Sequence, residues 1–436
     1  MKLFNFLSAL YTFVYHIRQL SMSKNKDISL IQFQKYKFLV NYAWNNIPAY
    51  RKLWESYGFN PSMLKTLDDI KLIPMIDKNF IRENFDDLVS IGYDKSRLSV
   101  VTTGGTTGMP MRFYIDQYAA RSKELAYQLW SSWHFWSHRQ GIDRVVTLRG
   151  KRIRDSLINK GVYWQNNLRE NGIYMSSFHI SEKTYDIYIN KLREYKPRYI
   201  KAYPSSIVAL CLLMKRNGDK GIEGLKGVIC SSETIYDSHR KLIKETLGVD
   251  ILSLYGHSEK AVCAYQNKSG NMHFPPLYGY VEFLDENGNH VSQKGSKAHI
   301  VATSFDNFYF PFIRYKTDDC VDVHSSGVIK VAEKILGRKQ EFVYNIYGNK
   351  LPFTCSDETM WHIKGIVAYQ YVQNEWGKLE LHLQVNDSFK KESVAEIIKK
   401  SEKIFVDCTV NVVFVNNIEK TISGKFRYLI QNVAER

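Results

Sequence analysis

The sequence has no pair of closely spaced cysteines. Its six cysteines are scattered over 436 residues, so neither a disulfide framework nor a zinc cluster is indicated. It also has no apolar run of the roughly 18 residues that a membrane-spanning helix needs, no internal repeat and no low-complexity tract. These absences favour a folded enzyme-sized protein in a reducing cytoplasm.

The apolar stretch at residues 3–14 is the closest approach to a targeting segment. His16 and Arg18 interrupt it, and no small-residue cleavage site follows. We therefore expect an amphipathic first helix that packs against its own domain, with peripheral membrane contact left open.

Positive charge is in excess: 60 Lys and Arg against 44 Asp and Glu give a net charge of +16. Such a balance favours polyanionic partners such as nucleotides, CoA, acidic glycans or an anionic membrane surface, but a Lys-rich surface kept for solubility is the more frequent explanation. The basic residues form no concentrated stripe, so a nucleic-acid partner is not indicated. With 44% hydrophobic and 24% charged residues, the chain has the composition of a globular protein.

A strand-then-helix rhythm between residues 143 and 259 predicts a parallel α/β layer. The expected strands are residues 144–148, 198–203, 228–230 and 251–255. Helices are expected at 185–195, ending before Pro197, and at 238–247, ending at Gly248.

Polar residues follow three of these strands. They are Tyr203-Pro204-Ser205-Ser206, Ser231-Ser232-Glu233 and Tyr255-Gly256-His257-Ser258-Glu259. Ligands of open α/β sheets collect at the carboxyl ends of the strands, so we expect these three tips to line a site.

The pattern changes after residue 278 to short strands and turns, with a hairpin signal at residues 285–288. Past residue 336 we expect a strand at 342–346, paired strands around 366–385, a strand at 410–415, and helices near 357 and at 393–405. The predicted fold class is α/β. A large N-terminal domain, residues 1–337, combines parallel sheet layers with a β-rich subdomain, and residues 338–436 form a small α+β domain.

The strongest local motif lies between strand-like residues 98–101 and 112–115. It reads Thr102-Thr103-Gly104-Gly105-Thr106-Thr107-Gly108-Met109-Pro110. Its glycines let the backbone approach a ligand, and its hydroxyls and N–H groups can donate to phosphate oxygens. The segment lacks the Gly-Lys-Ser/Thr of a Walker loop, so we interpret it as a different phosphate cradle. The alternative is a Gly/Thr-rich hairpin turn, which would need fewer residues.

With four further motifs in order, this loop makes the sequence resemble the adenylate-forming enzyme superfamily. Within it, the sequence is similar to the phenylacetate-CoA ligase-like branch that includes capsular polysaccharide biosynthesis proteins, from about residue 30 to the C-terminus. The second motif is the tip Tyr255 to Glu259. The resemblance implies that Tyr255 packs on adenine, Ser258 touches the α-phosphate and Glu259 binds Mg²⁺. A hydrolase elbow is the competing interpretation of Ser258, but its final glycine is missing.

Arg314-Tyr315-Lys316-Thr317-Asp318-Asp319 resembles the family's Tyr-Arg-Thr-Gly-Asp. The resemblance implies that Asp319 holds the ribose hydroxyls. Asp318 stands where the family has glycine, and aspartate tolerates left-handed backbone better than most residues.

Two motifs near the C-terminus complete the resemblance. Gly337-Arg338-Lys339-Gln340-Glu341 is similar to a Gly-Arg-x-Asp-Asp element, which implies that Arg338 reaches the nucleotide and that a hinge follows. Thr421-Ile422-Ser423-Gly424-Lys425-Phe426-Arg427 is similar to the family's Gly-Lys loop. That similarity implies that Lys425 contacts the carboxylate and the α-phosphate, and that the small domain is mobile.

The resemblance as a whole implies an AMP-forming acid ligase with ATP and Mg²⁺ as cofactors, CoA as one candidate, and Lys425 and Glu259 as catalytic residues. Residues expected to bind the nucleotide also include Gly256 and the tip residues Ser232 and Glu233. The carboxylic acid is expected at Tyr203, Ser205, Ser206 and His257. The acceptor would be CoA, a carrier protein or an amino sugar, and a homodimer is left open. The alternative is a non-catalytic nucleotide-binding scaffold in a glycan-assembly complex.

Overall fold

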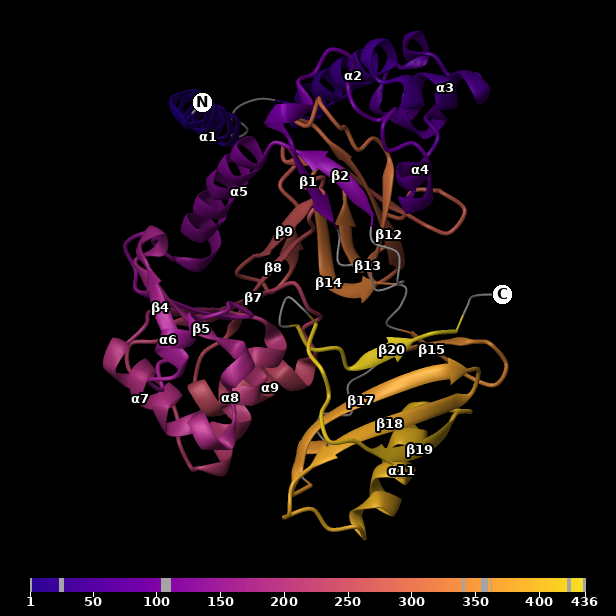
Figure 1. The fold of residues 1–436 in the computed structure, drawn as a ribbon. Helices are drawn as coiled ribbons and strands as arrows, with labels where there is room; N and C mark the ends of the chain where they lie inside the picture. The colour runs from indigo at the N-terminus through magenta and orange to yellow at the C-terminus, as the bar shows by residue number, and fades with distance from the viewer. Residues whose placement is uncertain are drawn as a thin grey trace. The chain divides into compact units, whose positions relative to one another are not determined.

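The computed structural model describes residues 2–22, 27–102, 111–338, 342–353, 360–361, 363–421 and 425–433. The chain forms two compact units, residues 1–140 with 254–337 and residues 141–253 with 338–436, here called the first and the second unit. The chain enters the first unit for the second time within β8 (Ile251–Gly256) and leaves it at the end of β14 (Lys330–Arg338). Figure 1 follows the chain by colour.

The first unit joins N-terminal helices to an antiparallel sheet. Its helices are α1 (Lys2–Met22), α2 (Ile28–Asn46), α3 (Pro48–Ser56), α4 (Lys78–Glu83) and α5 (Gln117–Ser131). The strands β9 (Cys263–Gln266), β10 (Met272–His273), β11 (Gly279–Leu284), β12 (Lys297–Ser304) and β13 (Tyr315–Ser326) follow. In the order β11-β12-β13-β14-β10-β9-β8, every pair with a described register is antiparallel. The predicted β-rich subdomain is confirmed.

The predicted hairpin turn also forms, since the Gly288 amide donates to the Asp285 carbonyl at 3.1 Å. Beyond the turn, Leu284 and His290 form an isolated bridge, and β11 itself pairs with β12 farther along the chain. A separate pair of strands, β1 (Ser99–Thr102) and β2 (Arg112–Ile115), stands on either side of the Gly/Thr segment.

The second unit begins with the predicted parallel layer. Its strands are β3 (Val145–Arg149), β4 (Trp164–Asn167), β5 (Gly172–Ser176), β6 (Tyr199–Ala202) and β7 (Gly227–Ser231), and its helices are α6 (Asp155–Ile158), α7 (Tyr185–Tyr195), α8 (Pro204–Arg216) and α9 (Asp237–Leu247). The strand order is β8-β7-β6-β3-β5-β4, with β5, β3, β6 and β7 parallel. Helix α7 has the predicted bounds, and α9 ends at Gly248, whose φ of 74° closes the helix.

The C-terminal part of the second unit is the predicted α+β lobe. It contains β15 (Phe342–Tyr344), β16 (Lys350–Pro352), β17 (Ile366–Glu375), β18 (Lys378–Val385), α11 (Ser393–Ile404), β19 (Thr409–Phe414) and β20 (Leu429–Gln431). Four strands form a sheet in the order β19-β18-β17-β20, and α11 lies against it (Figure 1). The helix predicted near residue 357 lies outside the described residues.

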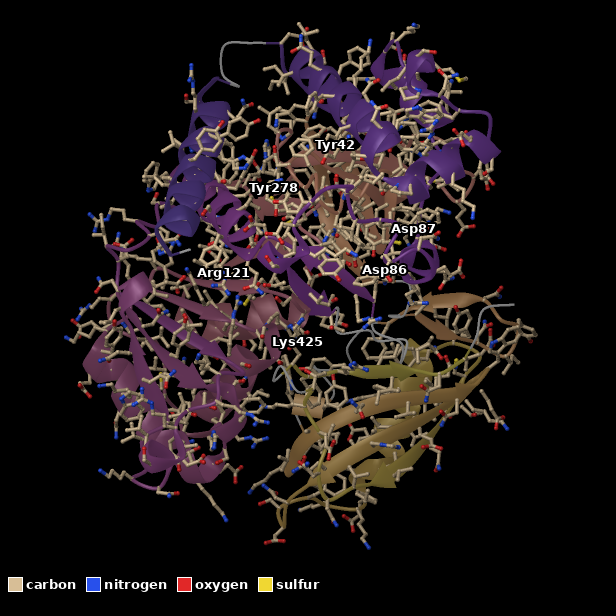
Figure 2. The ribbon with its side chains drawn as sticks, turned by 45° about the horizontal axis from the view of Figure 1, so that its top comes forward. Tyr42, Asp86, Asp87, Arg121, Tyr278 and Lys425 are labelled. Atoms are coloured by element: carbon tan, nitrogen blue, oxygen red, sulfur yellow. The ribbon has the colours of Figure 1, made fainter. Side chains whose placement is uncertain are left out.

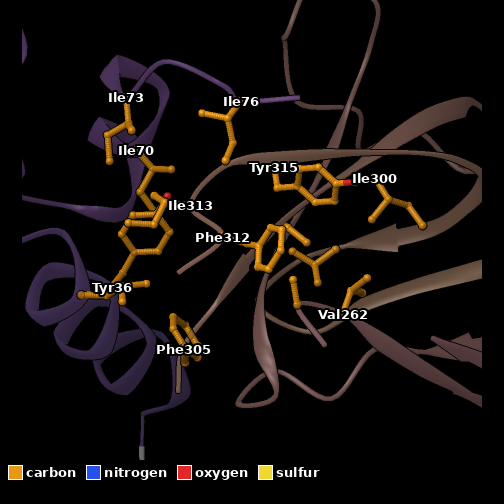
Figure 3. Packing of buried hydrophobic residues seen from close by; sticks show 14 of the residues in the cluster. Tyr36, Ile70, Ile73, Ile76, Val262, Ile300, Phe305, Phe312, Ile313 and Tyr315 are labelled. Carbon is orange, nitrogen blue, oxygen red and sulfur yellow. The ribbon is translucent and has the colours of Figure 1, made fainter. Parts of the chain in front are cut away.

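The core of the first unit is rich in aromatic and β-branched side chains. Tyr36 of α2, Ile73 and Ile76 pack with Phe312 and Tyr315 of the β-rich part (Figure 3). Burial of such side chains contributes about 1.5–3 kcal/mol each, so this packing holds β13 in place.

Helix α1 packs along α5, as expected for a packing element. His16 and Leu20 are buried on its inner side, whereas Leu10, Tyr11 and Val14 are exposed. Among the described residues, no helix is both long enough and apolar enough to cross a membrane.

A buried cluster of charges ties these helices to the β-rich part. The Asp306 carboxylate lies 3.0 Å from Lys123 Nζ of α5 and 3.1 Å from Lys35 Nζ of α2, and His16 Nε2 of α1 is 4.0 Å away. Lys123 also donates to the carbonyl of Tyr278, a residue labelled in Figure 2. Burial alone would raise the pKa of Asp306, but the two ammonium groups lower it well below its usual range.

We expect Asp306→Asn to lower the free energy of unfolding by about 3 kcal/mol, because it leaves two buried ammonium groups without a counter-charge. The lowered pKa of Asp306 means that its contribution is fully present at neutral pH and is lost as the pH falls through that pKa. The decrease in unfolding free energy caused by Asp306→Asn should therefore be the same at pH 7 and pH 5. Denaturant unfolding measures it, and the exposed Asp86, ion-paired to Lys95 at 3.6 Å, is the control. Equal effects of Asp86→Asn and Asp306→Asn would contradict the prediction.

Candidate functional site

The Gly/Thr motif itself can be followed only at its start. Thr102 is exposed at the end of β1, opposite Arg112 at the start of β2. Residues 103–110 lie outside the described residues, so the predicted roles of Thr103, Gly104, Gly105, Thr106, Thr107 and Gly108 stay predictions.

Two carboxylates of the first unit lie beside tyrosine hydroxyls. The Tyr255 hydroxyl, near the end of β8, donates to Asp319 Oδ2 on β13 at 2.6 Å. The Tyr315 hydroxyl donates to Glu259 Oε1 at 3.2 Å, and both carboxylates are buried. Burial raises the pKa of Tyr315 and the Glu259 charge raises it further, so the phenol stays protonated and remains a donor. The structure thus joins the second and third motifs through paired hydrogen bonds.

The remaining residues of the second motif surround Glu259. His257 Nδ1 lies 3.1 Å from Glu259 Oε2, while Gly256 and Ser258 are exposed. Within the described residues no three His, Cys, Asp or Glu side chains form a metal cluster. A magnesium ion bound together with a nucleotide needs only one or two protein carboxylates, because phosphates and water supply its other ligands, so Glu259 fits that role.

Asp318 adopts the conformation that a glycine would supply at this position. Its φ is 65°, in the left-handed region, and its Oδ2 accepts from Lys78 Nζ at 2.5 Å. The preceding Arg314 is also left-handed, at φ 48°, and is fixed by a two-pronged ion pair with Glu282 at 3.0 and 3.1 Å. Aspartate was expected to tolerate left-handed backbone, and position 318 requires that conformation. The buried ion pair of Arg314 with Glu282 was not predicted from the sequence.

The strand tips of the second unit form one polar row because their strands are parallel and in register. Arg149 of β3 is level with Ser176 of β5, and the pairing of β3, β6 and β7 brings Tyr203 and Ser231 level with it. Arg149 Nη2 donates to Ser231 Oγ at 2.7 Å, and its guanidinium carbon lies 5.2 Å from the centroid of the Tyr203 ring. Ser206, in the first turn of α8, is also buried.

Arg149 was not among the predicted site residues. The signal that could have found it is the basic run Arg149-Gly150-Lys151-Arg152-Ile153-Arg154, which directly follows a predicted strand.

Glu233 is the centre of this row. Its carboxylate accepts from the Ser205 amide at 2.9 Å, the Ser205 hydroxyl at 3.0 Å and the Phe426 amide at 3.1 Å. The Ser205 amide belongs to the first turn of α8 and has no partner within the helix, so Glu233 caps the helix. Burial raises the pKa of Glu233, an effect that these hydrogen bonds oppose. Ser232 just before it has a φ of 73°, which turns the chain sharply after β7.

Lys425 is anchored to the same row by its neighbours. The Lys425 amide donates to Thr421 Oγ1 at 3.0 Å. The Phe426 amide is bound by Glu233, and Lys425 Nζ (Figure 2) lies 6.0 Å from the centroid of the Tyr203 ring. The structure thus brings the predicted catalytic lysine to the predicted acid-binding tip. Arg338 ends β14, and Gln340 and Glu341 lie outside the described residues.

Glu233→Ala should speed amide hydrogen exchange at Phe426 and Ser205 about tenfold, because each amide loses an acceptor worth about 1.4 kcal/mol. The control is Glu223→Ala, which removes an exposed ion pair with Lys196 in the same unit. Mass-resolved exchange of peptides covering residues 201–208 and 420–428 measures the effect. Unchanged exchange in both peptides would show that Glu233 does not hold the C-terminal segment.

The chain is similar to known proteins along most of its length. Residues 348–432 match the family model described as the CapK C-terminal domain. The chain is 24% identical to Protein CapK of Staphylococcus aureus, over 98% of this chain and 94% of that protein. It is 22% identical to the phenylacetate-coenzyme A ligase of Aromatoleum evansii, over 95% and 96% of the two chains.

The fold is also similar to those of solved CoA ligases. 2-Hydroxyisobutyryl-CoA ligase, in the postadenylation state with R3-HIB-AMP, matches with a TM-score of 0.67 at 19% identity, over 92% of this chain and 89% of that chain. The anthranilate CoA ligase AuaEII, in complex with anthranoyl-AMP, matches with a TM-score of 0.52 at 16% identity, over 77% and 66%. The chain is therefore a homologue of CapK and the phenylacetate-CoA ligases, and it has the fold of the adenylate-forming CoA ligases.

Proposed function

We propose that this chain activates a small carboxylic acid with ATP and passes the acyl group to an acceptor. A carboxylate oxygen attacks the α-phosphorus of ATP, the bond to the β-phosphate breaks, and acyl-AMP and pyrophosphate form. A thiol or amine then attacks the acyl carbon, AMP leaves and the attacking group gives up its proton. The observation that carries the proposal is the anchoring of Lys425 beside Tyr203 by Glu233.

Charge is the main obstacle to the first step, because both reactants are anions. A cation fixed beside the acid offsets their repulsion and stabilises charge that develops in the transition state. Lys425 is assigned this role. Tyr203, Ser205, Ser206 and His257 are assigned to the acid.

The nucleotide roles fall mainly to the first unit. Thr102 to Gly108 and Ser258 would hold the phosphates. Tyr255 would pack on the adenine, and Asp319 would bind the ribose hydroxyls. Mg²⁺, held by Glu259, would supply Lewis-acid neutralisation of the phosphates. Gly256, Ser232, Glu233 and Arg338 complete the nucleotide-binding set.

The similarity to CapK supports an acceptor in surface polysaccharide synthesis, such as an amino sugar, beside CoA or a carrier protein. The similarity to ligases disfavours a non-catalytic scaffold. Residues 338–436 are proposed to act as a small domain that withdraws Lys425 before transfer.

ATP with Mg²⁺ should raise the unfolding temperature, because a ligand that binds only the native state adds about 2.7 kcal/mol at a hundred times its Kd. Glu259→Gln should remove the part of the shift that depends on Mg²⁺ and leave the part given by ATP with EDTA. The exposed Glu286→Gln is the control. A full Mg²⁺-dependent shift in Glu259→Gln would contradict the metal role.

Lys425→Ala should slow acyl-AMP formation by about 10² to 10³, the usual loss of one preorganised electrostatic contact. Given pre-made acyl-AMP, the same variant should transfer the acyl group at a near-normal rate. Single-turnover measurements separate the two steps, with Lys391→Ala, an exposed lysine of the same lobe, as the control. Equal damage to both steps would show that Lys425 has only a structural role.

A further inference from the structure

Arg149 is a half-buried cation at the carboxyl edge of the parallel sheet, and its bonding is incomplete. A guanidinium has five N–H donors. Nη2 donates to Ser231 Oγ, but Nε is buried and has no acceptor among the described residues. Burying unmatched charge is costly, so a purely structural arginine at this position would be expected to have a carboxylate or carbonyl partner.

The two carboxylates in its surroundings are engaged elsewhere. Glu170, whose charge is coupled to that of Arg149, is bonded to Lys201 at 2.7 Å. Glu233 accepts from Ser205 and Phe426. Along the described chain, no carboxylate forms an ion pair with Arg149.

Two serine hydroxyls on the same edge of the sheet also lack hydrogen-bond partners among the described residues. Ser177 follows the tip of β5 and Ser206 lies in the first turn after β6, and both are almost fully buried. Neither Oγ has a hydrogen-bond partner within the described residues. Buried donors without acceptors are destabilising unless a ligand supplies the acceptors. With Arg149, they favour a ligand rich in acceptor oxygens.

We propose that Arg149 binds a second anionic group of the acid, so that the preferred substrate is a dianion, either a dicarboxylate or a phosphono- or phospho-carboxylate. The inference rests on the proposed function, which assigns Lys425 to the reacting carboxylate. The two cations lie 5.2 Å and 6.0 Å from the centroid of one ring, Tyr203. Two cations at one ring suit a substrate with two anionic groups, whereas the tail of a monocarboxylate would leave Arg149 unmatched.

The experiment compares acids of matched length: butyrate, succinate and 3-phosphonopropionate. Pyrophosphate release gives kcat/KM for each, and the shift in unfolding temperature without ATP gives binding independently of catalysis. The wild type should prefer a dianion to butyrate, and Arg149→Met should lower kcat/KM for the dianion by about 10- to 100-fold, the range for charge-assisted hydrogen bonds. Butyrate should change less than threefold. The rank of succinate against 3-phosphonopropionate identifies the second group.

Arg152→Met is the matched control, because Arg152 is an exposed arginine of the same loop and should leave the preference intact. Ser231→Ala removes the bond that orients Arg149 and should weaken the preference in part, which keeps the test valid if Arg149→Met does not fold.

A wild-type preference for butyrate, or equal losses for both acids in Arg149→Met, would overturn the inference. If no acid is activated but the dianions still stabilise the wild type and not Arg149→Met, the anion site stands and the proposed function fails. The absence of both activity and stabilisation would overturn both.

Discussion

The half-buried carboxylate of Glu233 is the constraint on which the second unit depends. A carboxylate in a desolvated position must be satisfied by donors, and here they come from the start of α8 and from the C-terminal segment. These bonds fix Tyr203 and Phe426 relative to β7, and therefore place Lys425 at the strand tips. Removing that carboxylate would leave the C-terminal segment without its bond to β7.

The chemistry follows from the distribution of charge within each unit. The second unit presents Arg149 and Lys425 around one aromatic ring, and the neighbouring carboxylates of Glu170 and Glu233 are already bonded, which suits an anionic substrate. The first unit presents Glu259 and Asp319, each beside a tyrosine donor, which suits a metal and hydroxyl groups. Under the proposed function, these residues would serve the two halves of ATP-dependent acid activation, the acid and the nucleotide.

Local sequence signals predicted the parts of the fold that depend on the backbone conformation of a few neighbouring residues. Pro197 and Gly248 marked the ends of α7 and α9 because their backbones stop a helix, and Asp318 adopts the left-handed turn that the motif needs. The Asp306 cluster was not predictable, since it joins His16, Lys35 and Lys123 from three helices. The bond from Phe426 to Glu233 spans 193 residues, and no periodicity encodes it. Arg149 stands in a basic run that follows a predicted strand, but its incomplete bonding is visible only in three dimensions.

The most direct test of the central claim is carboxylate-dependent exchange of labelled pyrophosphate into ATP, measured over a panel of acids. Exchange requires reversible formation of an acyl-adenylate and is independent of the acceptor. The account predicts exchange with at least one acid, dependent on Mg²⁺. Mg²⁺-dependent ATP binding with no exchange across mono- and dianionic acids would contradict it.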